Sequence, residues 1–384
     1  MDQQAKLDFL KQLISIDSAG GHEEKVTQFL KDALEKHNIQ VQLVEVEPGR
    51  HDVIAKLGNG NGPTLAFEGH QDTVALGERD EWDHDPLGGE VVGDKIYGRG
   101  TTDMKAGLAA EALSLMELAD EGVELNGTLE FIATVAEESS QHNHMQGAQT
   151  LVKKGLIGDV DAIIIAEPSD SQLDFAHKGS ITYKISSIGK TAHSSMPQLG
   201  YNAIAPLVHF YNLQDEYFKT FDQAENKYLG KTIPVVTKID GGHQLNSVPD
   251  YAELFAKVRT IPEISNQEIW DHLKKIIKKV NEEDHAKLSL TVLGDKIPVV
   301  TDPDADFIKK LHPIAEKTLK RSVKVQGVAF GTDASELSKG NDHFSMAVLG
   351  PGNKTAHAIN EWVSLTTYYE FIDMFDQIAK EYLK

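Results

Sequence analysis

Residues 162–168 read Ala-Ile-Ile-Ile-Ala-Glu-Pro, so a short apolar run passes directly into a carboxylate and a proline. Uniform apolarity over so few residues is typical of a central strand that is covered on both faces. The segments around it alternate between strand patterns, as at residues 64–68 and 128–136, and helical patterns, as at residues 104–118. This alternation predicts an α/β fold in which helices cover a sheet.

A different pattern interrupts this alternation in the middle of the chain. There the predicted order is strand, helix, strand, strand, helix, strand, and Ser265 with Glu268 forms a capping box before the second helix. This order is typical of a small α+β unit. We therefore expect a discontinuous main domain of residues 1–178 and 295–384 and an inserted domain of residues 179–294.

The composition excludes several classes of partner and cofactor. The 384 residues include 38 Lys and Arg against 59 Asp and Glu, which gives a formal charge of −21. Because nucleic acids and anionic membrane surfaces are bound by basic faces, we expect neither as a partner. Cysteine is absent, which excludes thiolate metal sites and cysteine nucleophiles. Any metal ion must therefore be held by His, Asp and Glu.

The sequence carries no targeting or membrane signal that we recognise. Its first residues are polar and lack the apolar centre of a signal peptide. No stretch approaches the roughly 18 apolar residues that a membrane-spanning helix needs. We therefore expect a cytoplasmic protein.

Histidines and carboxylates follow the ends of several predicted strands, and one carboxylate precedes a predicted helix. These residues are His70, Asp72, Asp103, Glu137, Glu138, Glu167 and His357. Each has an ordinary explanation: Asp103 suits a helix N-cap, and Glu137 and Glu138 could project into solvent. Together they provide the nitrogen and oxygen ligands that zinc prefers, and a shared carboxylate can bridge two metal ions that activate water.

The order of these motifs resembles the zinc aminoacylase and carboxypeptidase family, and the resemblance covers nearly the whole chain. The motifs are Gly69-His70-Gln71-Asp72, Gly98-Arg99-Gly100-Thr101-Thr102-Asp103-Met104-Lys105, Glu137-Glu138, Glu167-Pro168, Ala192-His193-Ser194-Ser195 and Thr355-Ala356-His357. The resemblance implies a mixed-sheet dinuclear metallopeptidase domain. It also implies that the inserted α+β domain is ferredoxin-like and serves as a lid or dimerisation domain.

The resemblance assigns metal ligands and the identity of the ions. His70, Asp103 and Glu167 would hold one ion, and Asp103, Glu138 and His357 the other, so that Asp103 bridges the two. Two divalent ions are expected. Zinc is preferred, and cobalt or manganese also suits such ligands.

Three further residues receive catalytic roles from the resemblance. Glu137 resembles the general base that takes a proton from the attacking water, and Asp72 resembles the acid that orients His70. His193 matches a histidine that, in relatives that dimerise, reaches the partner's active site and stabilises the oxyanion. The alternative for His193 is a surface or capping role. We therefore expect a homodimer formed through the inserted domain.

Four residues resemble elements that position the substrate: Arg259, Asn246, Gly331 and Thr332. Arg259 suits bidentate binding of a carboxylate, although an ion pair at a strand edge would explain it too. The segment from Gly331 differs from the Ser-Asp-Gly-Arg form associated with succinyl-diaminopimelate enzymes. Residues 139–144 add His142 and His144, which we expect in an exposed loop rather than in a third metal site.

The implied activity is metal-dependent hydrolysis of a linear amide in an N-acyl amino acid or short peptide. Succinyl-diaminopimelate desuccinylase, in amino-acid biosynthesis, is the first expectation, and acetylornithine deacetylase is the second. One alternative is a dipeptidase or carboxypeptidase of the same family. Another is a catalytically silent metal-binding relative, which we expect to lack the base, whereas Glu137 is present.

Overall fold

The computed structural model describes residues 1–138 and 145–384, and these fall into two compact units. The first unit comprises Met1–Ala176, Val300–Gly327 and Thr332–Lys384, and the second comprises His177–Val299 and Val328–Gly331. The sequence predicts an inserted domain of residues 179–294, and the longer segment of the second unit is His177–Val299. The four residues Val328–Gly331 belong to the second unit, whereas the sequence reading placed them in the main domain.

The first unit is built on a large mixed sheet. Among the described residues its strand order is β1-β2-β6-β3-β7-β15-β8-β13, with β14 paired to β8. The strands are β1 (Val41–Glu47), β2 (Arg50–Gly58), β3 (Thr64–His70), β6 (Thr128–Thr134), β7 (Ala162–Pro168), β8 (Leu173–His177), β13 (Val299–Val300), β14 (Val325–Val328) and β15 (Ser345–Gly350). β3, β6, β7 and β15 run parallel, and β1 and β2 are antiparallel. The expected α/β fold with a mixed sheet is confirmed.

β7 is a central strand, as its uniform apolarity predicts. It pairs in parallel with β3 on one side and β15 on the other. Its residues from Ala162 to Glu167 are buried. A small separate sheet has the order β16-β5-β4 and consists of β4 (Glu90–Val92), β5 (Lys95–Tyr97) and β16 (Trp362–Ser364).

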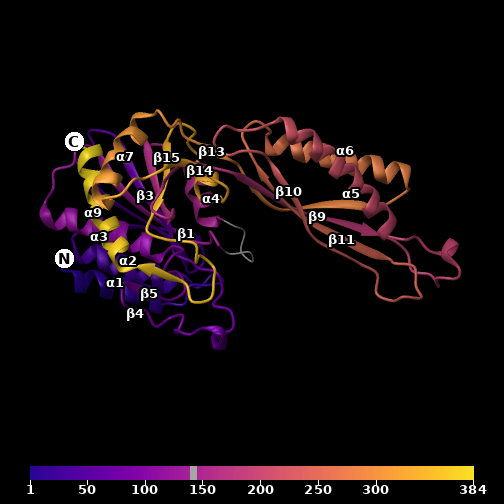
Figure 1. Ribbon diagram of the computed structural model, residues 1–384, viewed down its shortest axis with the longest axis horizontal. Coiled ribbons are helices and arrows are strands. Elements are labelled where there is room, and N and C mark those ends of the chain that lie inside the picture. The colour runs from indigo at the N-terminus through magenta and orange to yellow at the C-terminus, as the bar shows by residue number, and fades with distance from the viewer. Residues whose placement is uncertain (139–144) are drawn as a thin grey trace. The chain divides into compact units, whose positions relative to one another are not determined.

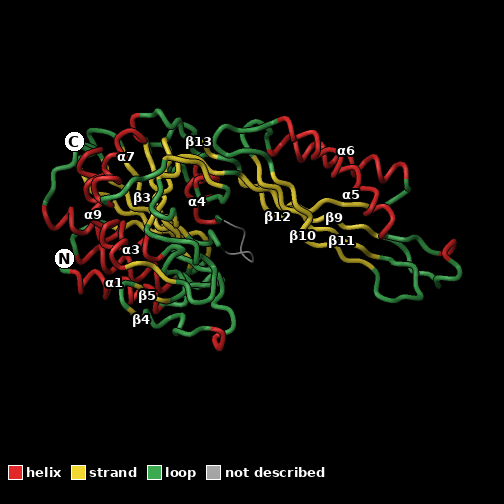
Figure 2. Tube along the Cα trace, in the orientation of Figure 1, coloured by secondary structure: helices red, strands yellow, loops and turns green. Residues whose placement is uncertain are grey.

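Helices of the first unit pack beside the strands, and Figure 2 shows α1, α3 and α9 gathered there. The helices are α1 (Gln3–Ser15), α2 (Glu24–Lys36), α3 (Lys105–Glu121), α4 (Gln146–Lys153), α7 (Asp306–Leu319), α8 (Ala334–Leu337) and α9 (Leu365–Tyr382). α3 is buried over most of its length, which its Ala- and Leu-rich sequence permits. No helix within the described ranges has the length and apolarity needed to cross a membrane.

Gly107 allows α3 to approach the end of β7 closely. A Cβ atom at this position would lie 2.1 Å from the Ala166 carbonyl oxygen and 2.8 Å from the Ala166 Cβ. We expect Gly107→Ala to lower the free energy of unfolding by about 1–3 kcal/mol, because the helix or the strand must move. Urea unfolding measures this change. In the matched control Gly158→Ala, where the added methyl meets nothing within 4 Å, we expect a change below about 0.5 kcal/mol. Equal effects in the two variants would contradict this account of the α3–β7 contact.

The second unit is an α+β layer with the order of elements expected from the sequence. Its elements are β9 (Gly179–Ile188), α5 (Ile204–Lys219), β10 (Ile233–Gly241), β11 (Tyr251–Thr260), α6 (Asn266–Glu283) and β12 (Leu288–Lys296). The strands form an antiparallel sheet in the order β10-β11-β9-β12, which is the ferredoxin-like arrangement. Figure 1 shows α5 and α6 along one side of these strands. Apolar residues of the helices and of the strand face beneath them form the core.

Candidate metal centre

Parallel strands of the first unit end where the candidate ligands lie. His70 is the last residue of β3, Glu167 is the penultimate residue of β7, and Glu138 follows the end of β6. Because parallel strands share one carboxyl edge, these side chains come together from distant parts of the sequence. Asp103 comes just before α3, and His357 lies in the segment between β15 and β16. The peptide bond between Asp103 and Met104 is cis.

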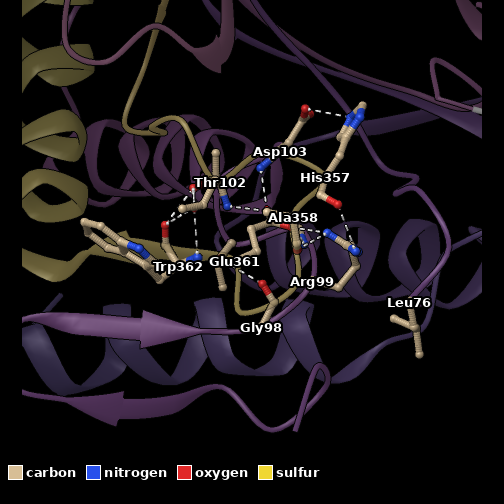
Figure 3. Close-up of polar contacts among 12 residues, drawn as sticks. Leu76, Gly98, Arg99, Thr102, Asp103, His357, Ala358, Glu361 and Trp362 are labelled. Carbon is tan, nitrogen blue, oxygen red and sulfur yellow. Dashed lines mark hydrogen bonds and ion pairs between the residues drawn. The ribbon is translucent and has the colours of Figure 1, made fainter. Parts of the chain in front are cut away.

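Asp103 lies between the two histidines. Its Oδ1 is 3.1 Å from Nε2 of His70, and its Oδ2 is 3.2 Å from Nε2 of His357. Figure 3 shows the side chains of Asp103 and His357 pointing toward each other. His70 Nε2 is also 3.6 Å from a Glu167 oxygen, and His357 Nε2 is 2.5 Å from a Glu138 oxygen. The structure thus brings together all five residues singled out as ligands.

The ligand atoms form two overlapping groups, which differ in part from those implied by the resemblance. Within the described residues, one group joins His70, Glu137 and Glu167, and the other joins His70, Asp103 and Glu138. In each group the ligand atoms lie within 4.8 Å of one another. Glu137 therefore lies where it could bind a metal ion as well as act as a base.

The carboxylates of this cluster are crowded and shielded from water. Burial, reinforced by the negative charge of Asp103, raises the pKa of Glu138 to about 7 and that of Glu167 well above its usual range. Hydrogen bonds to Asp103 and Glu138 raise the pKa of His357 to about 10. Burial opposes ionisation of Asp103, but hydrogen bonds from His357 and His70 outweigh it and hold the Asp103 pKa low. A divalent cation would offset the negative charge of these crowded carboxylates, and imidazole nitrogens and carboxylate oxygens are suitable ligands for it. The residues therefore fit such an ion.

Asp72 contacts His70 through its backbone carbonyl and contacts the turn after β6 through its carboxylate. His70 Nδ1 lies 2.9 Å from the backbone carbonyl oxygen of Asp72 and 3.5 Å from its carboxylate. The Asp72 carboxylate instead accepts hydrogen bonds from the backbone N–H groups of Glu137 (3.1 Å) and Glu138 (3.0 Å). In the neutral His70 tautomer that donates through Nδ1, Nε2 is free to bind a metal ion. Asp72 therefore orients His70 chiefly through its carbonyl and fixes the turn that carries both glutamates.

His193, Asn246 and Arg259 belong to the second unit. His193 is exposed, and its Nδ1 lies 2.7 Å from the Ser195 hydroxyl. The backbone N–H of Ser194 donates to the carbonyl of Asn246, so the structure places the segments of His193 and Asn246 side by side. Arg259 lies near the end of β11, and its charge helps burial to lower the pKa of Lys178.

Gly331 and Thr332, the remaining candidates for positioning the substrate, are adjacent in sequence but belong to different units. Gly331 belongs to the second unit, and Thr332 belongs to the first, where it is buried and its hydroxyl accepts from the Ala334 N–H. The segment 139–144, with His142 and His144, lies outside the described residues.

Lys105 is a buried residue to which the sequence reading assigned no role. Its Nζ donates to the carbonyl oxygens of Leu13 (2.9 Å) and Ile16 (2.6 Å), at the end of α1. Burial lowers the pKa of Lys105 to about 7. Through these contacts Lys105, the first residue of α3, ties α3 to the C-terminal end of α1. A lysine at the start of an Ala- and Leu-rich helix is the sequence feature that could have indicated this structural role.

A mixed sheet with histidines and carboxylates at its carboxyl edge is an arrangement that suits a metal-dependent hydrolase. Residues 66–381 match Peptidase family M20/M25/M40. The chain belongs to this family and is a hydrolase that acts on amide bonds.

The chain is also similar over its whole length to curated proteins. It is 35% identical to a probable succinyl-diaminopimelate desuccinylase of Staphylococcus aureus, covering 100% of this chain and 98% of that protein. It is 31% identical to an acetylornithine deacetylase of Vibrio atlanticus, with 98% of each covered.

Solved structures share the fold at lower identity. An M20 family metallo-carboxypeptidase from Sulfolobus solfataricus has a TM-score of 0.81 at 20% identity, covering 100% of this chain and 99% of that one. A dinuclear metal-binding M20 peptidase from Bacillus subtilis has a TM-score of 0.73 at 17% identity, covering 99% and 98%.

Proposed function

We propose that this chain is a two-metal hydrolase that removes the N-acyl group from an amino acid, with N-succinyl-diaminopimelate as its preferred substrate. The observation that carries the proposal is the position of Asp103 between His70 and His357. The names of the curated relatives support a deacylase and, among deacylases, a desuccinylase. The proposed location is the cytoplasm, where such an enzyme would serve amino-acid biosynthesis.

The proposed ligands are those that the sequence suggested: His70, Asp103 and Glu167 for one ion, and Asp103, Glu138 and His357 for the other. The distances among these side chains support this assignment. It is also supported by the structural similarity to the dinuclear metal-binding peptidase of Bacillus subtilis. When bound, two divalent ions lower the pKa of the attacking water and polarise the carbonyl of the scissile amide. Zinc is the preferred ion, with cobalt or manganese as alternatives.

Glu137 is the proposed general base and acid. Its backbone is held by Asp72, and its carboxyl group is buried beside the ligand cluster. In the proposed reaction it takes a proton from the water that attacks the amide carbon. It then gives a proton to the leaving nitrogen, so that the amine departs neutral.

Residues of the second unit, together with Thr332 of the first unit, have proposed roles in binding the substrate and the oxyanion. We assign the oxyanion hydrogen bond to His193 and substrate positioning to Arg259, Asn246, Gly331 and Thr332. The guanidinium group of Arg259 suits a carboxylate of the substrate.

The proposed homodimer uses the β10 edge of the sheet in the second unit. β10 is an edge strand whose residues are nearly all exposed, including Ile233, Val235 and Ile239. An exposed apolar edge is a template for pairing with another strand. We expect the wild type to sediment as a dimer and Val235→Lys to shift it toward the monomer.

A matched control comes from the opposite edge of the same sheet. Val292 on β12 is 50% exposed, as is Val235. We expect Val292→Lys to remain dimeric in sedimentation velocity. A wild-type monomer with full activity would contradict both the dimer and a required action of His193 in the partner's site.

A substrate panel tests the proposed activity. The metal-loaded enzyme is given N-succinyl-diaminopimelate, N-acetylornithine and dipeptides with added zinc, cobalt or manganese, and the released amine is measured. We expect the highest kcat/KM for the succinyl substrate. A preference for dipeptides would favour the peptidase alternative, which the structurally similar carboxypeptidase supports. Binding of two ions without hydrolysis of any substrate would favour a silent relative.

A further inference from the structure

Arg99 and Glu361 form a buried ion pair. In the sequence, Arg99 lies shortly before the proposed ligand Asp103, and Glu361 lies shortly after the proposed ligand His357. Arg99 Nη1 lies 2.7 Å from Glu361 Oε2, and the two side chains are 3% and 0% exposed. The guanidinium group also lies over the ring of Trp82, 5.1 Å from its centre. Figure 3 shows the pair between the segments that carry Asp103 and His357. In the sequence analysis Arg99 is placed in a motif without a role, and Glu361 is assigned no role.

The Glu361 carboxylate holds the segment that leads to Asp103. Besides Arg99, Oε2 accepts from the backbone N–H of Gly100 at 3.1 Å. Oε1 accepts from the backbone N–H groups of Thr102 (2.8 Å) and Asp103 (3.0 Å). Each carboxylate oxygen therefore accepts two hydrogen bonds, and one of the donors is the backbone of a proposed bridging ligand.

The Arg99 guanidinium holds the turn that carries His357. Nη1 donates to the carbonyl oxygen of Ala358 at 3.1 Å, and Nη2 donates to that of His357 at 3.4 Å. His357 has a φ of 64°, which is uncommon for a residue other than glycine and needs support from its surroundings. Arg99 thus binds the backbone of the second ligand, while its ion-pair partner binds the backbone of the first.

We propose that the Arg99–Glu361 pair is a positioning element that sets the relation of Asp103 to His357 and so fixes the affinity of the His357 metal site. Both residues act through backbone groups rather than through contact with an ion. The two ligands come from segments more than 250 residues apart in sequence, and one buried pair binds both. The inference rests on the proposed two-metal site and adds the elements that hold its geometry.

Glu361→Gln tests the proposal because it keeps the shape of the side chain and removes one of its two acceptor oxygens. Either orientation of the amide places an NH2 group against two donors, so two of the four hydrogen bonds are lost. The probe is Co²⁺ alone, titrated into the metal-free full-length chain and followed by visible absorption and calorimetry. We expect the affinity of one of the two sites to fall by about 10- to 100-fold, the range found when residues that support ligands are changed. His357→Ala identifies that site, because it should weaken the same binding step.

Glu23→Gln is a matched control for the loss of a buried ion pair. Arg50 binds Glu23 through Nη2–Oε1 (2.6 Å) and Nε–Oε2 (2.9 Å), with side chains 8% and 0% exposed. We expect this variant to lose stability to urea and to keep both Co²⁺ affinities. An equal fall in affinity in both variants would assign the effect to general destabilisation and overturn the proposal.

Further outcomes separate this inference from the proposed function. A wild-type chain that binds fewer than two Co²⁺ ions contradicts the two-metal site itself. A wild type with two sites and a folded Glu361→Gln with unchanged affinities contradict the positioning role alone. If Glu361→Gln does not fold, Arg99→Lys carries the test, because one ammonium cannot replace the planar contacts to the carboxylate and two carbonyls. Unchanged Co²⁺ affinities in Arg99→Lys would overturn the proposal.

Discussion

Glu137→Ala is expected to lower kcat by about 100- to 10,000-fold while the chain retains two metal ions. The expected loss is the usual contribution of a positioned general acid–base group. Proton transfer from water to the leaving nitrogen would then depend on solvent. Metal content by elemental analysis and kcat on the preferred N-acyl substrate, measured on the same sample, check both halves of this expectation.

The geometry makes the metal measurement decisive for Glu137. Its carboxylate lies in one ligand group with His70 and Glu167, so a role as a ligand is the competing assignment. If Glu137 is a ligand, Glu137→Ala loses an ion together with activity. Glu137→Gln is the companion variant, since its amide oxygen can still face an ion but cannot take up a proton. Two ions with lost turnover in both variants support the base, whereas metal loss contradicts it.

Asp103→Asn is expected to have the next largest effect. The carboxylate presents one oxygen to each histidine, at 3.1 Å and 3.2 Å, and an amide keeps only one oxygen. We expect no more than one tightly held ion per chain and a kcat lower by about 100- to 1,000-fold, the scale of losing a main electrostatic stabiliser. Equilibrium dialysis with Zn²⁺ and steady-state kinetics measure the two effects.

Asp94→Asn is the control for the change of charge. Asp94 is a surface carboxylate of the first unit that accepts hydrogen bonds from Ser364 and Thr366. We expect this variant to keep two ions and wild-type turnover. Retention of two ions by Asp103→Asn would show that Asp103 does not bridge them.

Much of the fold could be predicted because its signals are local. The apolar run of β7 predicts a central strand, and the order of elements from β9 to β12 predicts the inserted α+β unit. Residues Val328–Gly331 join the second unit, but so short a segment has no periodicity from which this could be predicted.

The candidate site was predictable as a set of residues and less so as a set of contacts. Strand ends brought His70 and Glu167 together, as expected for a parallel sheet. Which atoms of Asp72 face His70 depends on backbone geometry that residue spacing does not encode. The Arg99–Glu361 pair joins segments 262 residues apart, and neither residue has a local pattern that indicates its partner.

The dependence of amide hydrolysis on bound metal is the most direct test of the proposed two-metal hydrolase. The chain is freed of metal with a chelator, and Zn²⁺, Co²⁺ or Mn²⁺ is then added back in steps while hydrolysis of N-succinyl-diaminopimelate is followed. We expect no turnover in the metal-free chain and full turnover when two ions are bound per chain. Undiminished hydrolysis by the metal-free chain would show that this chain is not a metal-dependent hydrolase.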